Sequence, residues 1–510
     1  MKAKFFLKQT GAGQKDWKVQ PVEIPASAPT APTIAATSEE NDYRLQVLHA
    51  SDMEADVVSL ETAPRFAALV DRLEDSPEVD ASVTVAAGDT FIPGAFLSAG
   101  NDPALRPALK TALGQLFGFD GSGTDLRENA GRPDIGILNA IGFDASCIGN
   151  HEFDLGSTEF ANVVLPDVRG TLANLRHYGA AFPYLSANLS FSGVPAGESA
   201  LAARSTVAIL PVSRFRANPA TDATYVSTAA TNVARHPKIA RAAIIERGEE
   251  KIGVLGVTLP DLANISSPGR VTVTGPQGAT LVSPRTYDLD GLAAHLQPVV
   301  DALRTNGCNK IILLTQLQQI ENEKGLARKL DGVDVIVAGG SGTIYANDPA
   351  NLLPGDSAAG PYPFLTTDKK GNTVAIVSTD GQYQYLGRLV VEFNAAGELV
   401  GASGDTLPAT DAQVARLWGV DTNAPYAAGT RGGAVRGLTE AVGAVIRAKD
   451  GLILGRASVF LEGRRTAVRQ QESNFGNLSA DANLWYARRY DSRVRVSLKN
   501  GGGIRNAIGS

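Results

Sequence analysis

Residues 145–154 read Ala145-Ser146-Cys147-Ile148-Gly149-Asn150-His151-Glu152-Phe153-Asp154. The first four residues suit a buried β-strand, and the glycine ends that strand at a run of polar side chains. Asn150 offers an oxygen ligand for a metal ion, while the side chain of the adjacent His151 points away from it, toward a substrate. Asp154 can orient this imidazole and keep it protonated, as carboxylates do for catalytic histidines.

The same arrangement, an apolar strand followed at once by polar residues, occurs six times. Helix-like segments at residues 64–74, 135–141, 289–305 and 320–330 separate the strands, so the pattern predicts an α/β fold. Continuous apolar strands indicate sheets that are covered on both faces. Because the carboxyl ends of strands bind ligands in such folds, the six polar ends predict a functional site. The predicted strands are residues 45–49, 82–87, 145–148, 310–314, 333–338 and 373–378.

Length and composition set further limits. A chain of 510 residues is too long for one ordinary core, and its 44% hydrophobic and 20% charged residues are typical of globular proteins. The net charge of −6 gives no overall basic field, so no nucleic-acid partner is expected. No apolar run approaches the roughly 18 residues that cross a bilayer, and the apolar start is too short for a signal peptide. Cys147 and Cys308 are expected to be buried free thiols, and His49 a core residue.

Changes in composition divide the chain into four parts. Residues 1–43 are expected to form a tail and a linker rich in Pro, Ala and Thr. Residues 44–395 carry the predicted catalytic domain, and residues 396–454 form a helical connection through 408–418 and 432–449. Residues 455–510 are interpreted as two strands, 455–461 and 495–498, around a helix at 477–490. They are too few for a stable domain of this kind, so we expect an incomplete C-terminal domain.

Three strand ends carry the oxygen ligands that a two-metal hydrolytic site requires. Such a site holds two cations about 3.5–4 Å apart, with a carboxylate between them. Asp52, Asp89 and Asn150 follow separate strands and supply carboxylate and amide oxygens. Each aspartate alone also fits an ordinary turn or a helix cap. The six defined positions from Gly149 to Asp154 after a buried strand are more specific and favour a functional role.

These motifs resemble the 5′-nucleotidase branch of the calcineurin-like metallophosphoesterases. The resemblance covers about residues 44–510 and has two independent sets of motifs in the order expected for the family. The matching segments are Leu48-His49-Ala50-Ser51-Asp52, Gly88-Asp89, Gly149 to Asp154, Tyr184-Leu185-Ser186-Ala187-Asn188, residues 334–340, residues 469–478 with Asp481-Ala482, and Asn500-Gly501-Gly502-Gly503-Ile504-Arg505.

The resemblance implies a four-layer α/β/β/α sandwich with a dinuclear site for divalent metal ions. A linker helix and a partial α/β nucleotidase domain would follow the sandwich. By position, Asp89 would bridge the two ions, Asp52 would hold the first and Asn150 the second. His151 and Asp154 would form the catalytic dyad.

The resemblance also implies a small-molecule phosphoester or nucleotide substrate. Arg469, Asn500 and Arg505 would contact the nucleoside or its phosphate, which a guanidinium binds through two parallel hydrogen bonds. The family stacks the base between two aromatic rings beyond this loop, and such a clamp is not expected before Ser510. A secreted or periplasmic location is implied, and no oligomeric state is indicated.

The chain departs from the family pattern where histidine ligands are expected. Glu54 stands in the first motif where the family has histidine, Gln316 stands at a strand end, and the last loop reads Gly339-Gly340-Ser341-Gly342-Thr343. One interpretation is an oxygen-rich ligand set that favours Mn²⁺, Mg²⁺ or Ca²⁺ over Zn²⁺. The other is a second ion that is weakly bound or absent, with reduced or lost activity. The oxygen set would be Asp52, Glu54, Asp89, Asn150 and Gln316.

The leading hypothesis is a metal-dependent phosphomonoesterase that hydrolyses nucleoside 5′-phosphates with two divalent ions and the His151–Asp154 dyad. Two alternatives stay open. One is a phosphodiesterase or nucleotide-sugar hydrolase that uses the same centre. The other is a non-catalytic protein that keeps the fold with a degenerate metal site.

Overall fold

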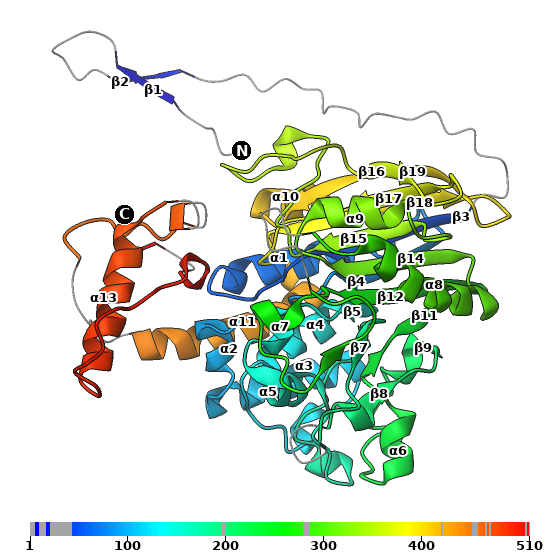
Figure 1. Ribbon diagram of the computed structural model, residues 1–510, viewed down its shortest axis with the longest axis horizontal. Coiled ribbons are helices and arrows are strands. Elements are labelled where there is room, and N and C mark those ends of the chain that lie inside the picture. The colour runs from blue at the N-terminus through cyan, green and yellow to red at the C-terminus, as the bar shows by residue number, and fades with distance from the viewer. Residues whose placement is uncertain are drawn as a thin grey trace.

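The computed structural model describes residues 6–9, 17–20, 43–195, 200–278, 286–419, 422–450, 457–464, 467–468, 471–504 and 507–508. Within these residues, two large sheets form the centre of the molecule (Figure 1). The first sheet has the strand order β19-β18-β3-β4-β5-β6-β10-β8, and the second has the order β16-β17-β15-β14-β12-β11-β9.

The strands of the first sheet are β3 (Tyr43–Ala50), β4 (Ala81–Ala86), β5 (Ala145–Cys147), β6 (Tyr184–Leu185), β8 (Ser205–Thr206), β10 (Ile239–Ala240), β18 (Tyr385–Phe393) and β19 (Leu399–Pro408). Those of the second sheet are β9 (Leu210–Pro211), β11 (Ala242–Arg247), β12 (Glu250–Thr258), β14 (Lys310–Gln316), β15 (Val335–Gly339), β16 (Phe364–Thr367) and β17 (Thr373–Val377). Two short pairs, β1 (Phe6–Gln9) with β2 (Trp17–Gln20) and β7 (Leu189–Ser190) with β13 (Thr272–Val273), lie outside these sheets.

The central strands of both sheets run parallel. This holds for β3, β4, β5 and β6 in the first sheet and for β12, β14, β15 and β17 in the second. All seven residues of β14 are buried, which is the pattern of a strand covered on both faces. The carboxyl ends of neighbouring parallel strands therefore lie at common edges of the two sheets.

The two sheets pack face to face. The Thr258 hydroxyl donates to the Ile148 carbonyl over 2.6 Å, and thus joins the end of β12 to the end of β5. A Cβ at Gly256 would lie 2.2 Å from the Leu185 carbonyl oxygen, so only glycine allows this approach of the sheets. The contact brings the strand ends of one sheet close to those of the other.

Helices cover the outer faces. α1 (Ser59–Leu73), α4 (Arg132–Ile141) and α11 (Arg431–Asp450) lie on the side of the first sheet, and α8 (Leu289–Thr305) and α9 (Ile320–Ala327) pack on the second. This arrangement confirms the predicted four-layer α/β/β/α sandwich. The other α-helices of the described residues are α2 (Ala95–Ala99), α3 (Arg106–Phe117), α5 (Gly156–Val164), α6 (Ala230–Arg235), α7 (Leu262–Ile265), α10 (Asp411–Trp418) and α13 (Asn474–Arg488).

Some predicted elements differ from the structure. β19 pairs with β18, so the first sheet continues past residue 395, the predicted boundary of the catalytic domain. Residues 495–498 form no strand, and in the described part of 455–461 only Leu461 makes an isolated bridge, to Ile508. Within the described residues, these segments have no neighbouring sheet that could supply the hydrogen bonds of a strand. The expected tail contains the short pair of β1 and β2.

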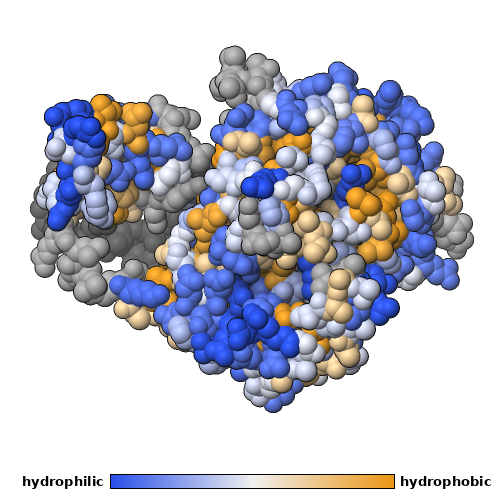
Figure 2. Space-filling model, turned by 60° about the horizontal axis from the view of Figure 1, so that its bottom comes forward, coloured by the Kyte–Doolittle hydropathy of each residue, from blue (hydrophilic) through white to orange (hydrophobic). Residues whose placement is uncertain are grey.

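The two cysteines and His49 lie in the environments that the sequence predicts. Cys147 and Cys308 are buried and free, and buried His49 lies with Nε2 2.7 Å from the Tyr362 hydroxyl, as a core histidine would. Among the described residues, no helix has the length and apolar character that a membrane crossing requires. Figure 2 shows one face of the molecule, on which polar residues are interspersed with apolar ones.

Candidate metal centre

Four predicted site residues come together at the carboxyl ends of strands. Asp52, Asp89 and Asn150 follow β3, β4 and β5, while Gln316 is the last residue of β14 in the facing sheet. Gln316 Nε2 donates to Asp52 Oδ1 over 2.8 Å and also donates to Asp89 Oδ2. Asn150 Oδ1 accepts from Gln318 Nε2 over 2.6 Å. Asp52, Asp89 and Gln316 therefore meet at the strand ends, whereas the amide of Asn150 contacts Gln318.

The loops that carry the acids have an unusual backbone. The φ angle is +46° at Asp52, +35° at Glu54 and +48° at Asp89, in the left-handed region that side chains rarely occupy. Each such residue costs about 1–3 kcal/mol, and such strain clusters at functional sites. Hydrogen bonds hold the loops in place: the Glu54 N–H donates to the Asp89 carbonyl over 2.9 Å, and the Gly340 N–H donates to both Asp52 carboxylate oxygens at 2.8 Å.

His151 lies between two carboxylates in the short 3₁₀ turn His151–Phe153. Its Nδ1 is 2.5 Å from Asp154 Oδ2, and its Nε2 is 3.1 Å from Glu54 Oε1. The Ser266 hydroxyl donates to the other oxygen of Asp154 over 3.0 Å, and so fixes the carboxylate that orients the ring. Ser266 is 112 residues from Asp154, and no motif in the sequence indicates its role.

Crowding of acids in a buried site shifts their pKa values. Burial, together with the charge of Glu54, raises the pKa of Asp52 to about 7. Burial also raises the pKa of Asp89, against the opposing effect of His151. Burial lowers the pKa of His151, but Asp89, Asp154 and Glu54 outweigh it and raise that pKa to about 11. Buried carboxylates this close together are stabilised by positive charge, which the imidazolium supplies and a cation would increase.

Glu152 has a role that the motif did not reveal. Its buried carboxylate accepts from the backbone N–H groups of Asp89 at 3.1 Å, Thr90 at 2.7 Å and Gly149 at 2.7 Å. The Thr90 hydroxyl donates to it as well, over 2.7 Å. Glu152 therefore ties the loop after β4 to the loop after β5 and sets the spacing of their site residues.

The donor set fits divalent cations. Glu54, Asp89 and His151 each offer a ligand atom, and these atoms lie within 4.8 Å of one another. Gln316 Oε1 is buried and has no hydrogen-bond partner among the described residues, so it is a spare oxygen beside two carboxylates. Hard cations such as Mg²⁺, Mn²⁺ and Ca²⁺ prefer carboxylate and amide oxygens.

Of the three predicted substrate contacts, only Asn500 lies within the described residues. Arg469 and Arg505 lie outside the described residues. The Asn500 side chain is exposed, and its Oδ1 accepts from the Gly502 N–H over 3.1 Å. Their contact with a nucleotide stays a prediction.

The unfolding free energy of the chelator-treated protein is expected to fall as the pH rises above about 6.5. The pKa of an unfolded histidine is about 6.5, whereas the neighbouring carboxylates raise the pKa of folded His151 to about 11. Between these values the folded state binds more protons, so stabilisation that is complete below about pH 6.5 is lost as the pH rises. Urea unfolding at about pH 6 and about pH 9 should show a larger loss for the parent than for His151→Gln. An equal loss in both proteins would assign the dependence to another group.

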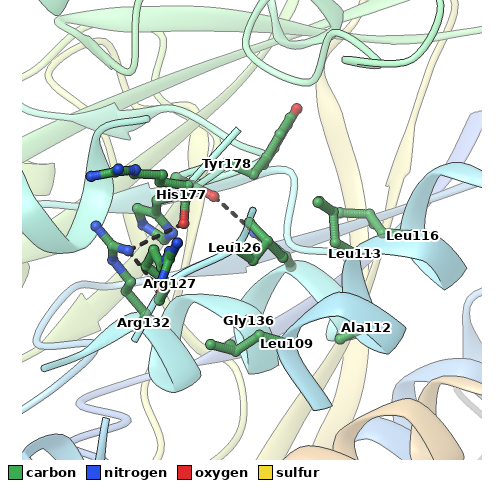
Figure 3. A pocket seen from close by; sticks show the side chains of 13 residues that line it. Leu109, Ala112, Leu113, Leu116, Leu126, Arg127, Arg132, Gly136, His177 and Tyr178 are labelled. Carbon is green, nitrogen blue, oxygen red and sulfur yellow. Dashed lines mark hydrogen bonds between the residues drawn. The ribbon is translucent and has the colours of Figure 1, made fainter. Parts of the chain in front are cut away.

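A separate cavity lies beside α3 and α4 and is lined by none of the metal-centre residues (Figure 3). Arg127 and Arg132 lie opposite Leu113 and Leu116 in this view. Nη1 of Arg132 donates to the Arg127 carbonyl over 2.7 Å and to the Arg176 carbonyl over 3.2 Å. Arg132 therefore serves to hold two backbone segments together.

The four-layer sandwich, with acids and amides at its strand ends, is the architecture of a metallophosphoesterase. No protein-family model matches the sequence. A snake venom 5′-nucleotidase of Naja atra is 27% identical over 393 residues, which are 74% of this chain and 57% of that protein. The 5′-nucleotidase of Homo sapiens is 27% identical over 388 residues, 73% of this chain and 51% of that protein. The chain thus spans about half the length of the curated relatives it matches.

A solved structure is also similar. The crystal structure of a 5′-nucleotidase precursor from Thermus thermophilus matches with a TM-score of 0.59 at 26% identity. The match covers 91% of this chain and 71% of that one. Together with the motifs, these similarities support the 5′-nucleotidase branch of the calcineurin-like metallophosphoesterases.

Proposed function

We propose that this chain is a metal-dependent phosphomonoesterase that hydrolyses nucleoside 5′-phosphates. The observation that carries the proposal is the meeting of Asp52, Asp89 and Gln316 through one amide group, with Glu54 and His151 beside them. The names of the relatives support the nucleotide as substrate.

Asp89 is the residue best placed to serve two cations. Its Oδ2 accepts from Gln316, on the Asp52 side, while its Oδ1 accepts from the His151 N–H over 2.8 Å, on the other side. Asp52 would hold a cation on the first side, and Glu54 or Asn150 would hold one on the second. Mn²⁺, Mg²⁺ or Ca²⁺ held there would supply the Lewis acidity that activates water for attack on phosphorus.

His151 is proposed as the acid that serves the phosphoryl group. Asp154 accepts the hydrogen bond from Nδ1–H, and Nε2 carries the proton that faces the acidic cluster. The Nε2–H, which meets Glu54 in the structure, would donate to a phosphoryl oxygen or to the leaving oxygen during turnover. The neighbouring carboxylates of Asp89, Asp154 and Glu54 raise the pKa of the imidazole to about 11, which favours its protonated form.

The proposed substrate contacts come from the C-terminal part of the chain. Arg469, Asn500 and Arg505 would bind the phosphate or nucleoside from the region of residues 455–510, which would act as the partial nucleotidase domain. A secreted or periplasmic location fits the snake venom relative.

The test of the proposed activity is release of phosphate from AMP and p-nitrophenyl phosphate with Mn²⁺, Mg²⁺, Ca²⁺ or Zn²⁺. No turnover with any metal in a folded sample would refute the activity and favour the non-catalytic alternative.

Replacing Asp154 with asparagine is expected to lower kcat by about 10–100-fold with little change in KM. The reason is that Asp154 orients His151 and stabilises its charge without contacting the substrate. Ser266→Ala, which removes one donor to Asp154, should have a smaller effect in the same direction. Asp120→Asn, on an exposed turn, is the control and should match the parent. Steady-state kinetics with AMP and Mn²⁺ measure all three, and an unchanged kcat in Asp154→Asn would remove the dyad from the mechanism.

A further inference from the structure

We propose that the Gln316 carboxamide is a two-position gate of the metal centre. In one position Nε2 donates to Asp52 and Asp89, and in the other Oε1 faces the same carboxylates and binds the cation between them. This inference rests on the proposed function, because it assumes that a divalent cation binds there.

The first position is the one the structure describes. Gln316 is fully buried, and its Nε2 donates to Asp52 Oδ1 over 2.8 Å and to Asp89 Oδ2. An amide nitrogen has two hydrogens, so one group can satisfy both carboxylates. A donor that points at both oxygens cannot coexist with a cation between them. In this position the amide therefore acts in place of positive charge and closes the site.

The second position follows from the oxygen of the same amide. Gln316 Oε1 is buried without a hydrogen-bond partner among the described residues. A Cβ at position 339 would lie 2.2 Å from this oxygen, so Gly339 leaves the room that the outer atom of the amide needs. The oxygen and nitrogen of an amide are nearly the same size, and the last torsion of glutamine has two broad minima. A half-turn therefore exchanges the two atoms within one volume.

Binding of a cation determines which of the two positions of the Gln316 amide is more stable. After the half-turn, three oxygens converge from Asp52, Asp89 and Gln316, and they repel one another unless a cation lies between them. Binding must first break the two hydrogen bonds of the closed position. The apparent affinity for the cation is therefore the intrinsic affinity multiplied by the fraction of molecules in which the amide is in the open position. The gate thus makes the site stable when empty and keeps it selective for ions that amide oxygens bind.

Two substitutions at residue 316 test the closed and the open position of the amide separately. Gln316→Leu removes both the donor and the oxygen, so the thermal midpoint in chelator should fall by several degrees and the Mn²⁺ dissociation constant should rise about tenfold. Gln316→Glu at about pH 8 adds a third carboxylate, so its midpoint in chelator should also fall, whereas Mn²⁺ should bind about tenfold more tightly. Calorimetric titration and thermal unfolding, each with and without metal, measure both effects. They require no turnover.

Gln46→Leu is the matched control. Gln46 is a buried glutamine on β3 whose Nε2 donates to the Leu73 carbonyl and the Ser82 hydroxyl, away from the metal centre. Its replacement should lower the midpoint equally with and without Mn²⁺ and leave the dissociation constant unchanged.

Nuclear magnetic resonance with ¹⁵N-glutamine labelling observes the amide itself, with the Gln316 NH₂ signals assigned through their loss in Gln316→Leu. Mg²⁺ should shift these signals.

The outcomes distinguish the gate from the activity. A parent-like midpoint of Gln316→Leu in chelator would overturn the closed position, and an unchanged Mn²⁺ affinity would overturn the open one. NH₂ signals that do not respond to saturating Mg²⁺ would also overturn the gate. Metal-dependent effects on binding without any phosphatase turnover would leave the gate standing and refute the proposed function.

Discussion

Replacing Asp89 with asparagine is expected to lower kcat/KM for AMP by about 10²–10³-fold or more, the largest effect of any single substitution in the site. Asp89 is buried, and its two oxygens reach the Gln316 amide on one side and the His151 backbone on the other. A neutral amide keeps the volume but loses the negative charge that would be shared between two cations. Initial rates at saturating Mn²⁺ and calorimetric Mn²⁺ binding provide the two measurements, and both should fall.

The control for this experiment is Asp301→Asn. Asp301 lies on α8 with 59% of its side chain exposed and pairs weakly with Arg304. The control should keep the parent rate and the parent affinity for Mn²⁺. If Asp89→Asn is folded and as active as the control, the metal centre has been assigned to the wrong residues.

Replacing Glu152 with leucine is expected to cause the largest loss of stability, about 3–5 kcal/mol. The leucine would leave the N–H groups of Asp89, Thr90 and Gly149 buried without their acceptor. Each unsatisfied buried donor costs about 1–3 kcal/mol, partly relieved by movement of the loops. Because the same bonds set the spacing of Asp89 and Asn150, activity should fall as well. Urea unfolding followed by circular dichroism measures the loss.

Two further variants are expected to lose less stability than Glu152→Leu and serve as its comparison. Glu152→Gln keeps the shape and one acceptor oxygen, so its loss of stability should lie between those of the parent and the leucine variant. Glu61→Ala removes an exposed partner of Arg65 on α1 and should change the unfolding free energy by only about 0–1 kcal/mol. A Glu152→Leu protein as stable as Glu61→Ala would show that water replaces the carboxylate and that the loops are held by other contacts.

The strands that carry the site could be predicted because their signal is local. The apolar run at residues 311–314, and the short apolar run of β5 before a glycine, identify strands without reference to the rest of the fold. The strand ends then place Asp52, Asp89 and Asn150 at one edge, because parallel neighbours end on the same side. The failed strand at 495–498 alternates polar and apolar residues as a strand can, but it has no partner strand in the part of the chain that the structure describes.

Apart from the local pair of His151 and Asp154, most contacts inside the site could not be predicted, because they join residues that are far apart along the chain. Gln316 reaches Asp52 across 264 positions and Asp89 across 227. Glu152 stands in the recognised motif, yet its function depends on backbone N–H groups of a loop 62 to 63 residues away. Side-chain identity gives the number of donors and acceptors but does not say which of them meet.

The sequence by itself determined the α/β class, the strand ends and the set of oxygen and imidazole groups available for chemistry, since periodicity and residue type are local properties. Only the tertiary structure decided that one glutamine amide bridges two aspartates, that Glu54 meets the His151 imidazole, and that Glu152 ties two loops together. The physical reason is that hydrogen bonds and ion pairs act over a few ångströms. Gln316 meets the two aspartates only after the two sheets have packed face to face, whereas the contacts of Glu54 and Glu152 form once the strands of the first sheet have paired.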